Sequence, residues 1–415
     1  MDNISQYLNK YYICNNKVVI QETIFLVMKF ISALTIVVLL FMLGCRQQSA
    51  EHLQAEIDTV AKRWVPDKRV GICSLMLVKG SGGEFVLKGE SMFPGAKEEV
   101  LQLLSSKGIT VIDSSVILPD TVNLEKNWGV ISLSVANLRS KPAHAAELIS
   151  QAIMGTPVRV LKEDDGWLFI QTPDNYLSWT NQSSVEQMTR SEIADWRNAE
   201  RIMFTGSCGI VYTDSKLTAV TSDLVAGAVV IRKSVNQDVT EVGLPDGRLG
   251  YVSNEKWLNF KQWKDTVSLI SNNMISTGEQ FLGFPYLWGG TSSKGMDCSG
   301  FVKTICFLNG VILERDASQQ INHGKEIDIS SGWDSLQKGD MLYFGSKQPF
   351  RVIHTGIYIG DSEVINSSGC IRINSLDKKR DDFSNYLSTT FLGARRIIGL
   401  QPEQGYLPVK LHPWY

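Results

Sequence analysis

A glycine-rich loop that runs directly into an apolar helix constrains this chain more than any other feature. Glycines and small polar residues dominate positions 289–300, which is typical of a loop. From Ser299 onward, apolar residues over 301–306 recur at helical spacing. Asp297 is a good N-cap, so Cys298 should lie in the first helical turn. Free N–H groups and the positive end of the helix dipole favour a thiolate there, which is the reactive form of cysteine.

A nucleophilic cysteine needs a base, and the chain contains five histidines. Four of them lie near a terminus, in a different predicted domain or in a polar loop: His52, His412, His144 and His323. His354 remains, at the beginning of a predicted strand over 354–359. A turn at 360–362 connects this strand to a second one over 363–366.

A hairpin folded at this turn would place His354 and Asn366 roughly opposite each other on one face. Directly opposed Cβ atoms lie about 4.5–5.5 Å apart, close enough for an amide to orient an imidazole. The sequence therefore predicts a Cys298–His354–Asn366 arrangement, in which Asn366 fixes the tautomer of the histidine.

Four motifs in this region carry a resemblance to a known family. In chain order they are Pro285–Gly290, Asp297–Gly300, Leu336–Phe344 and His354–Tyr358. With them, the region from Thr277 to Ile398 resembles the NlpC/p60 cysteine peptidases of bacterial cell walls. The resemblance implies a papain-like α+β core, with Cys298 on a helix packed against an antiparallel sheet that carries His354. The third catalytic position is often histidine in close relatives, whereas here it is Asn366.

The same resemblance implies roles for residues around the nucleophile. Tyr286 matches a family tyrosine whose hydroxyl faces the nucleophile and supports the oxyanion, although simple packing is the alternative. Asp297 would face the substrate's ammonium group in addition to capping the helix, with Ser299 beside it. Asp316 matches a family loop that contacts substrate, where Ala317 replaces a serine that relatives often carry.

A repeat precedes the peptidase-like region, from about Trp128 to Asn259. Its first copy has short β-rich runs at 155–161, 166–170 and 173–179, and its second copy has them at 227–231 and 245–251. Runs of this length, broken by turn residues, favour two small barrels. They resemble bacterial SH3-like domains, which precede the peptidase in this family.

Two interpretations of the barrels stay open. In the first, they only pack against the enzyme and space it. In the second, the first barrel walls the active site and limits it to short peptides with a free amino end, as the resemblance implies. Glu147 and Tyr176 are the candidates on that wall; the alternative is a solvated helix residue for Glu147 and a barrel core residue for Tyr176.

The N-terminal stretch has the layout of a secretory signal. Met28 and Lys29 precede an apolar run over 30–42 that ends in Leu-Gly-Cys at Cys45. This ending resembles a bacterial lipoprotein signal, which implies cleavage before Cys45, acylation of that cysteine and a lipid anchor in the membrane. Residues 1–27 make a poor signal region, which favours Met28 as the true start. The alternative is an uncleaved membrane anchor over 24–43. Both place the protein in the cell envelope, facing the periplasm or the exterior.

The length of 415 residues suits several domains. The predicted division is a leader and signal over 1–45, a small α/β domain over 46–125, SH3-like barrels over 126–190 and 191–260, a linker helix over 261–276, an NlpC/p60 peptidase domain over 277–400 and a C-terminal tail over 401–415. The fold class is therefore α+β, with a papain-like catalytic domain after two β-barrels and an α/β unit.

Composition and cysteine spacing exclude some classes of partner. The 41 Lys and Arg against 43 Asp and Glu give a net charge of −2, so no basic excess points to nucleic acid. None of the seven cysteines shows metal-ligand spacing, and no metal or cofactor is predicted. A monomer is expected.

The resemblance also implies a substrate. It is a murein stem peptide with a free N-terminal L-Ala, cut between γ-D-glutamate and the diamino acid, as by a γ-D-glutamyl-L-diamino acid endopeptidase. Two alternatives stay open. One is a hydrolase for intact peptidoglycan or another amide, and the other is a non-catalytic lipoprotein that binds the wall.

Overall fold

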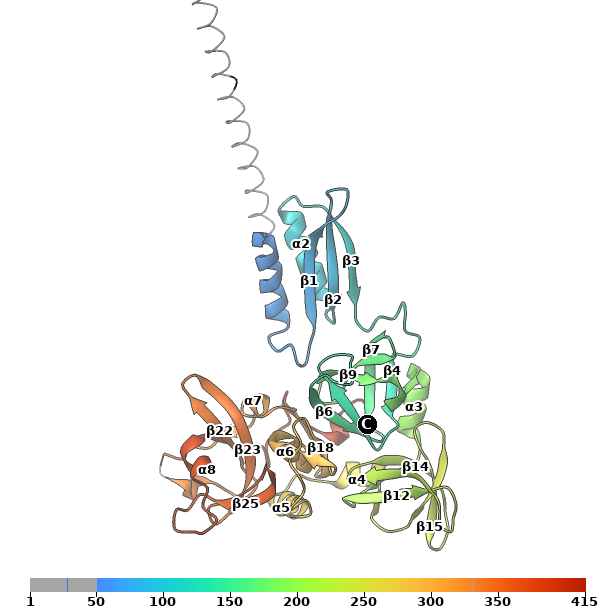
Figure 1. The fold of residues 1–415 in the computed structure, drawn as a ribbon, viewed down its shortest axis with the longest axis vertical. Coiled ribbons are helices and arrows are strands. Elements are labelled where there is room, and N and C mark those ends of the chain that lie inside the picture. The colour runs from blue at the N-terminus through green and yellow to red at the C-terminus, as the bar shows by residue number, and fades with distance from the viewer. Residues whose placement is uncertain (1–27, 29–50, 331) are drawn as a thin grey trace, which may run out of the picture. The chain divides into compact units, whose positions relative to one another are not determined.

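The computed structural model describes residue 28, residues 51–330 and residues 332–415. The predicted signal segment and the acylation of Cys45 lie outside the described residues. Within the described residues, no helix combines the length and the apolar character that crossing a bilayer requires. The chain divides into two compact units (Figure 1). One contains residues 51–66 and Cys73–Val116, and the other contains Asp67–Ile72 and Ile117–Tyr415.

The first unit packs helices on a small three-stranded sheet in which β1 and β2 are antiparallel. Its elements are a helix over 51–64, β1 (Cys73–Lys79), β2 (Phe85–Ser91), α2 (Pro94–Ser106) and β3 (Val111–Ile117), with the strand order β1-β2-β3. Apolar residues at helical spacing on both helices meet the inner side chains of the strands in one core: Leu53, Ile57, Val60, Leu75, Leu87, Val100 and Leu104.

The second unit begins with a seven-stranded antiparallel sheet. Its strands are β4 (Trp128–Ile131), β5 (Val135–Arg139), β6 (Leu148–Ile153), β7 (Pro157–Asp164), β8 (Trp167–Gln171), β9 (Leu177–Asn181) and β10 (Val185–Met188). The strand order is β10-β4-β7-β8-β9-β5-β6. Alternating side chains fill one core between the strands, among them Ile131, Leu138, Val160 and Leu168.

A second seven-stranded sheet repeats the first strand for strand. It contains β11 (Arg201–Phe204), β12 (Cys208–Tyr212), β13 (Val220–Val225), β14 (Val229–Val235), β15 (Val239–Gly243), β16 (Leu249–Ser253) and β17 (Trp257–Asn259). Its order, β17-β11-β14-β15-β16-β12-β13, matches the first sheet with every label raised by seven. Among the described strands neither sheet closes into the predicted barrel, because its two end strands do not pair with each other.

Three helices connect these sheets with the last part of the chain. The helix α3 (Arg190–Asn198) begins with a capping box between Thr189 and Glu192. The segment predicted as one linker helix is two helices, α4 (Phe260–Thr266) and α5 (Ser271–Glu279). They are separate because Val267 is extended (ψ 139°) and packs beside Trp263, whereas Leu269 packs into the peptidase-like core.

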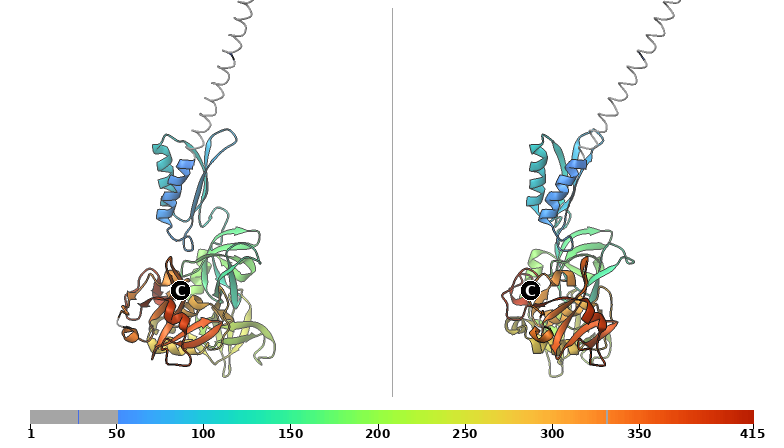
Figure 2. Two further views of the ribbon diagram at one scale, coloured as in Figure 1. Left: turned by 60° about the vertical axis from the view of Figure 1, so that its left-hand side comes forward. Right: turned by 90° about the vertical axis from the view of Figure 1, so that its left-hand side faces the viewer.

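The last part of the chain packs a helix on a six-stranded antiparallel sheet. The sheet runs β21 (Lys325–Glu326), β26 (Phe391–Arg396), β22 (Met341–Lys347), β23 (Phe350–Gly360), β24 (Glu363–Ser368) and β25 (Cys370–Ser375). The helix α6 (Cys298–Leu308) packs against β23 and β24. Figure 2 shows this sheet, coloured orange to red, from two further sides. The predicted α+β packing is confirmed.

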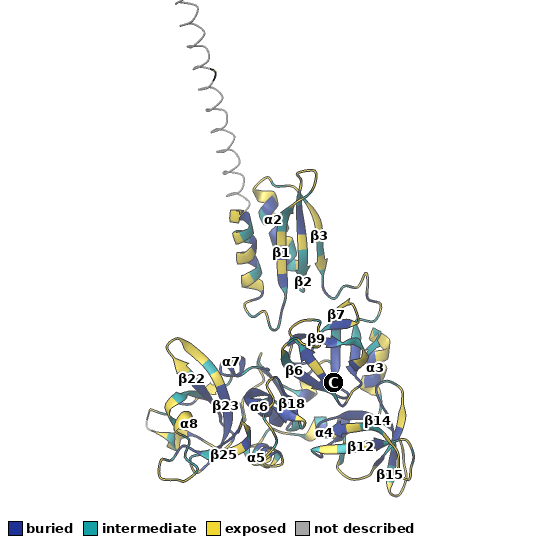
Figure 3. Cartoon of the chain, in the orientation of Figure 1, coloured by how far each residue is buried: buried dark blue, intermediate teal, exposed yellow. Residues whose placement is uncertain are grey.

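Burial explains why α6 is fixed on this sheet. Its inward side chains meet those of three strands in one apolar core: Phe301, Val302, Ile305, Cys306, Tyr343, Ile357 and Ile365. In Figure 3 the strands β22 and β23 and the helix α6 are mostly dark blue. The remaining short elements are β18 (Thr291–Ser292), β19 (Gly295–Met296), β20 (Val311–Leu313), α7 (Ala317–Gln320), α8 (Asn385–Thr390) and β27 (Tyr406–Pro408).

Candidate active site

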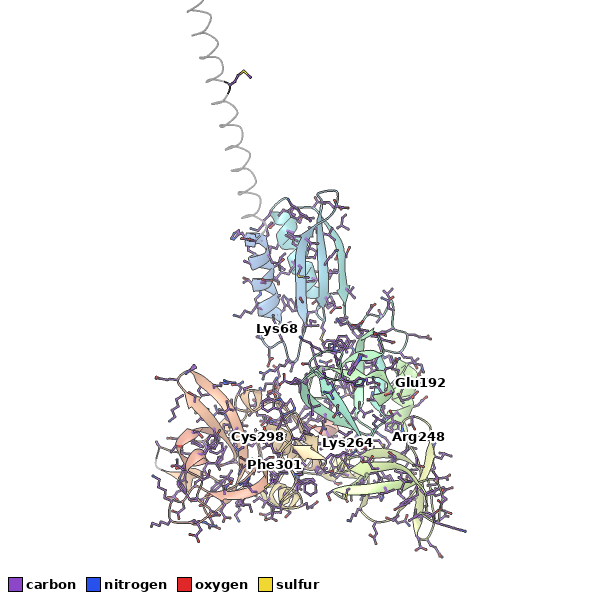
Figure 4. All side chains as sticks on the ribbon, viewed as in Figure 1. Lys68, Glu192, Arg248, Lys264, Cys298 and Phe301 are labelled. Atoms are coloured by element: carbon purple, nitrogen blue, oxygen red, sulfur yellow. The ribbon has the colours of Figure 1, made fainter. Side chains whose placement is uncertain are left out.

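The predicted start of the nucleophile helix is confirmed. Asp297 is the N-cap of α6, and its Oδ1 accepts a hydrogen bond from the backbone N–H of Gly300 at 2.7 Å. Cys298, labelled in Figure 4, is the first residue of the helix and is buried. The loop that precedes Cys298 is closed by a hydrogen bond from the backbone N–H of Asp297 to the carbonyl oxygen of Gly290.

The expected thiolate is not favoured at Cys298 in the free protein. Burial and the nearby carboxylate of Asp297 raise the pKa of the thiol to about 11. Hydrogen bonds from the backbone N–H groups of Thr355 and Ser299 lower this pKa, but by less than burial raises it. The expectation from the helix start was wrong because it left out desolvation. A base is therefore needed to generate the nucleophile.

His354 and Asn366 meet on the sheet, but not as directly opposed residues. The Nε2 atom of His354 lies 3.1 Å from Oδ1 of Asn366, and both side chains are buried. In the register of β23 and β24, however, Asn366 pairs with Gly356. The contact is diagonal, and it needs a glycine at 356, because a Cβ there would lie 2.9 Å from Cβ of Asn366.

The hydrogen bonds of Asn366 assign the tautomer of His354. The Nδ2 group of Asn366 donates to Oδ1 of Asn374 at 3.1 Å, so its Oδ1 faces the imidazole. Nε2 must then carry the hydrogen of that bond, which leaves Nδ1 as an acceptor. Burial lowers the pKa of His354. The imidazole is therefore neutral at neutral pH and can accept a proton at Nδ1.

The ring of Tyr386, on α8, packs against His354, and no sequence pattern indicates a role for this residue. The two ring centroids are 6.1 Å apart in an edge-on arrangement. Burial and the charge of Cys298 raise the pKa of Tyr386, which places this side chain near the nucleophile as well. Phe344 covers the imidazole at a centroid distance of 5.8 Å. His354 is thus held between two aromatic rings.

A buried arginine that the sequence analysis missed holds Asp297. The side chain of Arg315 is 2% exposed, and its Nη1 and Nη2 donate to Oδ1 and Oδ2 of Asp297 at 3.1 and 2.6 Å. Burial alone would lower the pKa of Arg315, but the Asp297 carboxylate raises it above its ordinary value. With Gly289 and Ser299 also donating, the carboxylate accepts hydrogen bonds on both oxygens. The available signal was a pair of charged residues, Glu314 and Arg315, directly after the apolar run 311–313.

Arg315 also connects the peptidase-like part to the first seven-stranded sheet. Its Nε donates to Oγ of Ser150 on β6 at 3.2 Å. Next to Ser150, the side-chain oxygen of Gln151 accepts hydrogen bonds from the N–H of Thr291 and the hydroxyl of Ser292. The glycine-rich loop is therefore fixed by buried polar contacts with β6.

The predicted site residues gather around one cleft of about 420 Å³. Seven of them line it: Glu147, Tyr176, Tyr286, Asp297, Cys298, Ser299 and Asp316. His354 and Asn366 do not line it but lie on β23 and β24, and Thr355, next to His354, donates its backbone N–H to Cys298. Burial and the charges of Cys298 and Asp297 raise the pKa of Tyr286, so its hydroxyl stays protonated and can donate a hydrogen bond. Among the described residues, no cluster of side chains is arranged to hold a metal ion.

The first sheet supplies one wall of this cleft. Glu147 is not on a helix, because it directly precedes β6, and its Oε1 accepts a hydrogen bond from Nε1 of Trp288 at 2.9 Å. Tyr176 is buried, and its hydroxyl donates to Oδ2 of Asp316 at 3.1 Å. Trp288 is a further cleft residue that the analysis missed, although it stands two positions after Tyr286.

Comparisons with known proteins agree with this geometry. The model of the NlpC/P60 family matches residues 283–396, and that of the bacterial dipeptidyl-peptidase SH3 domain matches residues 138–185. Dipeptidyl-peptidase 6 of Lysinibacillus sphaericus is 28% identical over 277 residues, which are 63% of this chain and 96% of that protein. A gamma-D-glutamyl-L-lysine dipeptidyl-peptidase of Bacillus cereus is 29% identical over 231 residues, 54% of this chain and 68% of that protein.

A solved structure shows the same fold. The crystal structure of an NlpC/P60 family protein from Bacillus cereus superposes with a TM-score of 0.56 at 24% identity, over 65% of this chain and 99% of that one. The fold and the relatives together define a cysteine peptidase. The chain belongs to the NlpC/P60 family and carries a bacterial SH3-like domain before its peptidase domain.

Proposed function

We propose that this protein is a cell-wall cysteine peptidase that cuts murein stem peptides with a free N-terminal L-Ala at the γ-D-glutamyl–diamino acid bond. One observation carries this proposal: the first sheet places Glu147 and Tyr176 in the same cleft as Cys298. A wall at this place suits a short peptide end better than a continuous polymer. Relatives named dipeptidyl-peptidase 6 and gamma-D-glutamyl-L-lysine dipeptidyl-peptidase support it.

The reaction would begin with proton transfer from Cys298 to His354. Because the pKa of the thiol is raised, Nδ1 of the neutral His354 takes the proton as the sulfur attacks the substrate carbonyl carbon. The oxyanion that forms is stabilised by N–H groups at the start of α6 and by the protonated hydroxyl of Tyr286. Asn366 keeps the imidazole in the required tautomer throughout.

Two further steps complete the cycle. The imidazolium of His354 gives its proton to the nitrogen of the diamino acid, and the C–N bond breaks to leave a thioester on Cys298. Water then attacks the thioester as His354 takes one of its protons, and His354 passes this proton to the departing sulfur. The dipeptide leaves as its carboxylate, and the second proton of the water goes to solvent. The second product, the diamino acid or the peptide that it begins, leaves with a free amine.

Recognition of the free amine would fall to the carboxylates of the cleft. Asp297 already accepts a buried bidentate contact from Arg315. Glu147 has no ion-pair partner among the described residues, and its known contact is the neutral indole N–H of Trp288. An ammonium group would therefore be paired best by Glu147, with Ser299, Asp316 and Tyr176 as neighbouring hydrogen-bonding groups.

The cellular setting and the domain division belong to the same proposal. Cleavage before Cys45 and its acylation would anchor the enzyme in the membrane, facing the periplasm or exterior, where murein peptides occur. We propose two SH3-like domains over 126–190 and 191–260, after an α/β domain over 46–125 and before the peptidase domain over 277–400. The repeated strand order supports treating the second sheet as SH3-like.

The bond and the nucleophile can be tested together. The purified protein is incubated with L-Ala-γ-D-Glu-L-Lys and with the diaminopimelate analogue, and the products are identified by mass spectrometry. L-Ala-γ-D-Glu should appear with the wild type and with His52→Ala, an exposed histidine, and should be absent with Cys298→Ala and His354→Ala. Release of fragments from intact sacculi without tripeptide cleavage would move the substrate to the polymer. Wall binding without any hydrolysis would favour a binding lipoprotein.

A further inference from the structure

A short segment far upstream of the peptidase domain reaches the cleft wall. Residues Asp67–Ile72 group with the second unit, although they precede its first sheet by many residues. The carbonyl oxygen of Arg69 accepts a hydrogen bond from the N–H of Leu177, at the beginning of β9. The guanidinium of Arg69 donates from Nη1 to Oδ2 of Asp316 and to Oγ of Ser318, both at 2.8 Å.

Asp67 orients this guanidinium. Nε and Nη2 of Arg69 donate to Asp67 at 2.7 to 3.1 Å, and the backbone N–H of Arg69 donates to its Oδ1 at 2.9 Å. Gln319, on α7, donates from Nε2 to Oδ2 of Asp67 at 3.0 Å. Arg69 is thus held between two carboxylates, and only one of them, Asp316, lines the cleft.

The three cleft carboxylates differ in their counter-ions. Asp297 is paired with the buried Arg315, and Asp316 is paired with Arg69. Glu147 is the one for which no ion pair exists among the described residues. Oδ2 of Asp316 is shared between Arg69 and the hydroxyl of Tyr176, so its orientation is set from two sides. The pair is partly exposed, at 38% and 30% of the side-chain areas, which moderates its strength.

We infer that Arg69 is a positioning residue of the cleft that sets substrate specificity: it neutralises Asp316 and fixes it as a hydrogen-bond acceptor, so that Glu147 remains the single anionic position for a cationic group. This inference rests on the proposed function, because it explains how the cleft recognises the amine of the stem peptide. Without Arg69, Asp316 becomes a second, loosely held anion. The substrate then loses one fixed contact and gains a competing place for its ammonium group.

Substitutions separate this role from a merely structural one. Arg69→Met should raise KM for the tripeptide about three- to tenfold and leave kcat within about twofold, because Arg69 does not touch the reacting atoms. Arg69→Lys keeps the positive charge but cannot bond Asp67 and Asp316 in the same two-sided geometry. This variant should have a KM between those of the wild type and Arg69→Met. Arg248→Met is the matched control, since Arg248 pairs with an aspartate two positions before it in the same manner.

A double-mutant cycle gives the sharper readout. Arg69→Met should change KM little when Asp316→Asn is already present, because its effect acts through Asp316. If Arg69 only holds its segment in place, its effect will add in full to that of Asp316→Asn. A fully additive cycle, or a loss confined to kcat, would overturn the inference.

An assay that needs no hydrolysis separates this inference from the proposed function. The alkylation rate of Cys298 is measured by peptide mapping with the cation (2-bromoethyl)trimethylammonium and with neutral iodoacetamide. Arg69→Met should raise the cation-to-neutral rate ratio about two- to threefold, and Arg248→Met should leave it unchanged. An unchanged ratio with Arg69→Met would overturn the inference. Absence of tripeptide cleavage by the wild type would instead overturn the proposed function, and the rate ratio would still decide the role of Arg69.

Discussion

The two seven-stranded sheets share one strand order but differ in what they contribute to the cleft. Their turns correspond closely: Gly155 and Gly227 lie two residues before the equivalent strands β7 and β14, with the same φ of 85°. The turns Thr172–Tyr176 and Leu244–Arg248 carry the same pair of backbone hydrogen bonds. At the last position of this turn, however, the first sheet has Tyr176 facing Asp316, and the second has an exposed Arg248 (Figure 4).

The edges of the two sheets differ in the same way. On β6, Ser150 and Gln151 bind Arg315 and the glycine-rich loop through buried hydrogen bonds. On β13, the equivalent of Gln151 is Asp223, which forms an exposed ion pair with Lys294. A repeated fold therefore does not repeat the site. A few side chains on one copy make it a wall of the cleft, and the following experiments test that difference.

The largest expected effect is on the reactivity of two cysteines. Since the pKa of Cys298 is raised to about 11, its thiolate fraction and its alkylation rate should increase about tenfold per pH unit, or roughly a thousandfold between pH 7 and pH 10. Cys208, exposed on β12 of the second sheet, serves as an internal reference in the same digest. A rate for Cys298 that is already level below pH 8 would instead indicate a preformed thiolate–imidazolium pair.

The next prediction compares the loss of stability when Arg315 and Arg248 are replaced. Arg315→Met leaves the buried Asp297 without its counter-ion and should lower the free energy of unfolding by roughly 3–5 kcal/mol, with loss of activity. Arg248→Met removes the exposed ion pair with Asp246 in the second sheet and should change the free energy of unfolding by about 0–1 kcal/mol. Thermal and denaturant unfolding measure both. Equal effects would show that the contact between Arg315 and the first sheet is not a main support of the site.

Two glycines with left-handed backbones test the contact with β6. Gly289 has φ 79°, and a Cβ there would overlap the carbonyl oxygen of Leu148. Gly247, in the second sheet, has φ 84° and open space around it. Gly247→Ala should cost about 1–2 kcal/mol of unfolding free energy from backbone strain alone. Gly289→Ala should cost about 1–3 kcal/mol more, and it should reduce kcat/KM as the loop moves. A smaller loss at 289 than at 247 would refute this contact.

The smallest expected effect is on kcat/KM when the hydroxyl of Tyr176 or of Tyr251 is removed. Tyr176→Phe removes the hydrogen bond to Asp316 and should lower kcat/KM for the tripeptide about two- to tenfold. Tyr251→Phe removes a comparable bond to Glu241 in the second sheet and should leave kcat/KM unchanged. Steady-state kinetics with both variants are the measurement. An equal loss in both would mean that the effect is a general one on stability.

Local chemistry made much of the site predictable from the sequence. The N-cap at Asp297, the helix start at Cys298 and the choice of His354 follow from spacing and from a count of histidines. The contact between His354 and Asn366 was predicted, but its register was not. Counting back from the turn at 360–362 pairs Asn366 with Gly356, as observed, so the sequence allowed the correct register. The shift between Tyr358 and Gly360 moves the pairing by one residue only.

The remaining features of the site depend on long-range contacts and on desolvation, which a local sequence pattern does not predict. Arg69 and Asp316 are 247 positions apart, so no spacing rule connects them. The raised pKa of Cys298 depends on how deeply the folded core covers the thiol. The break in the linker at Val267 likewise follows from the two different cores that its apolar residues join.

The central claim is that the first sheet makes the cleft specific for substrates with a free amino end. The most direct test is kcat/KM for L-Ala-γ-D-Glu-L-Lys against the same peptide with its amine acetylated, in the wild type and in Glu147→Gln. The wild type should prefer the free amine at least tenfold, and Glu147→Gln should lose most of this preference while still cleaving the peptide. Equal cleavage of both peptides by the wild type would contradict the claim and would indicate a cleft that accepts the polymer.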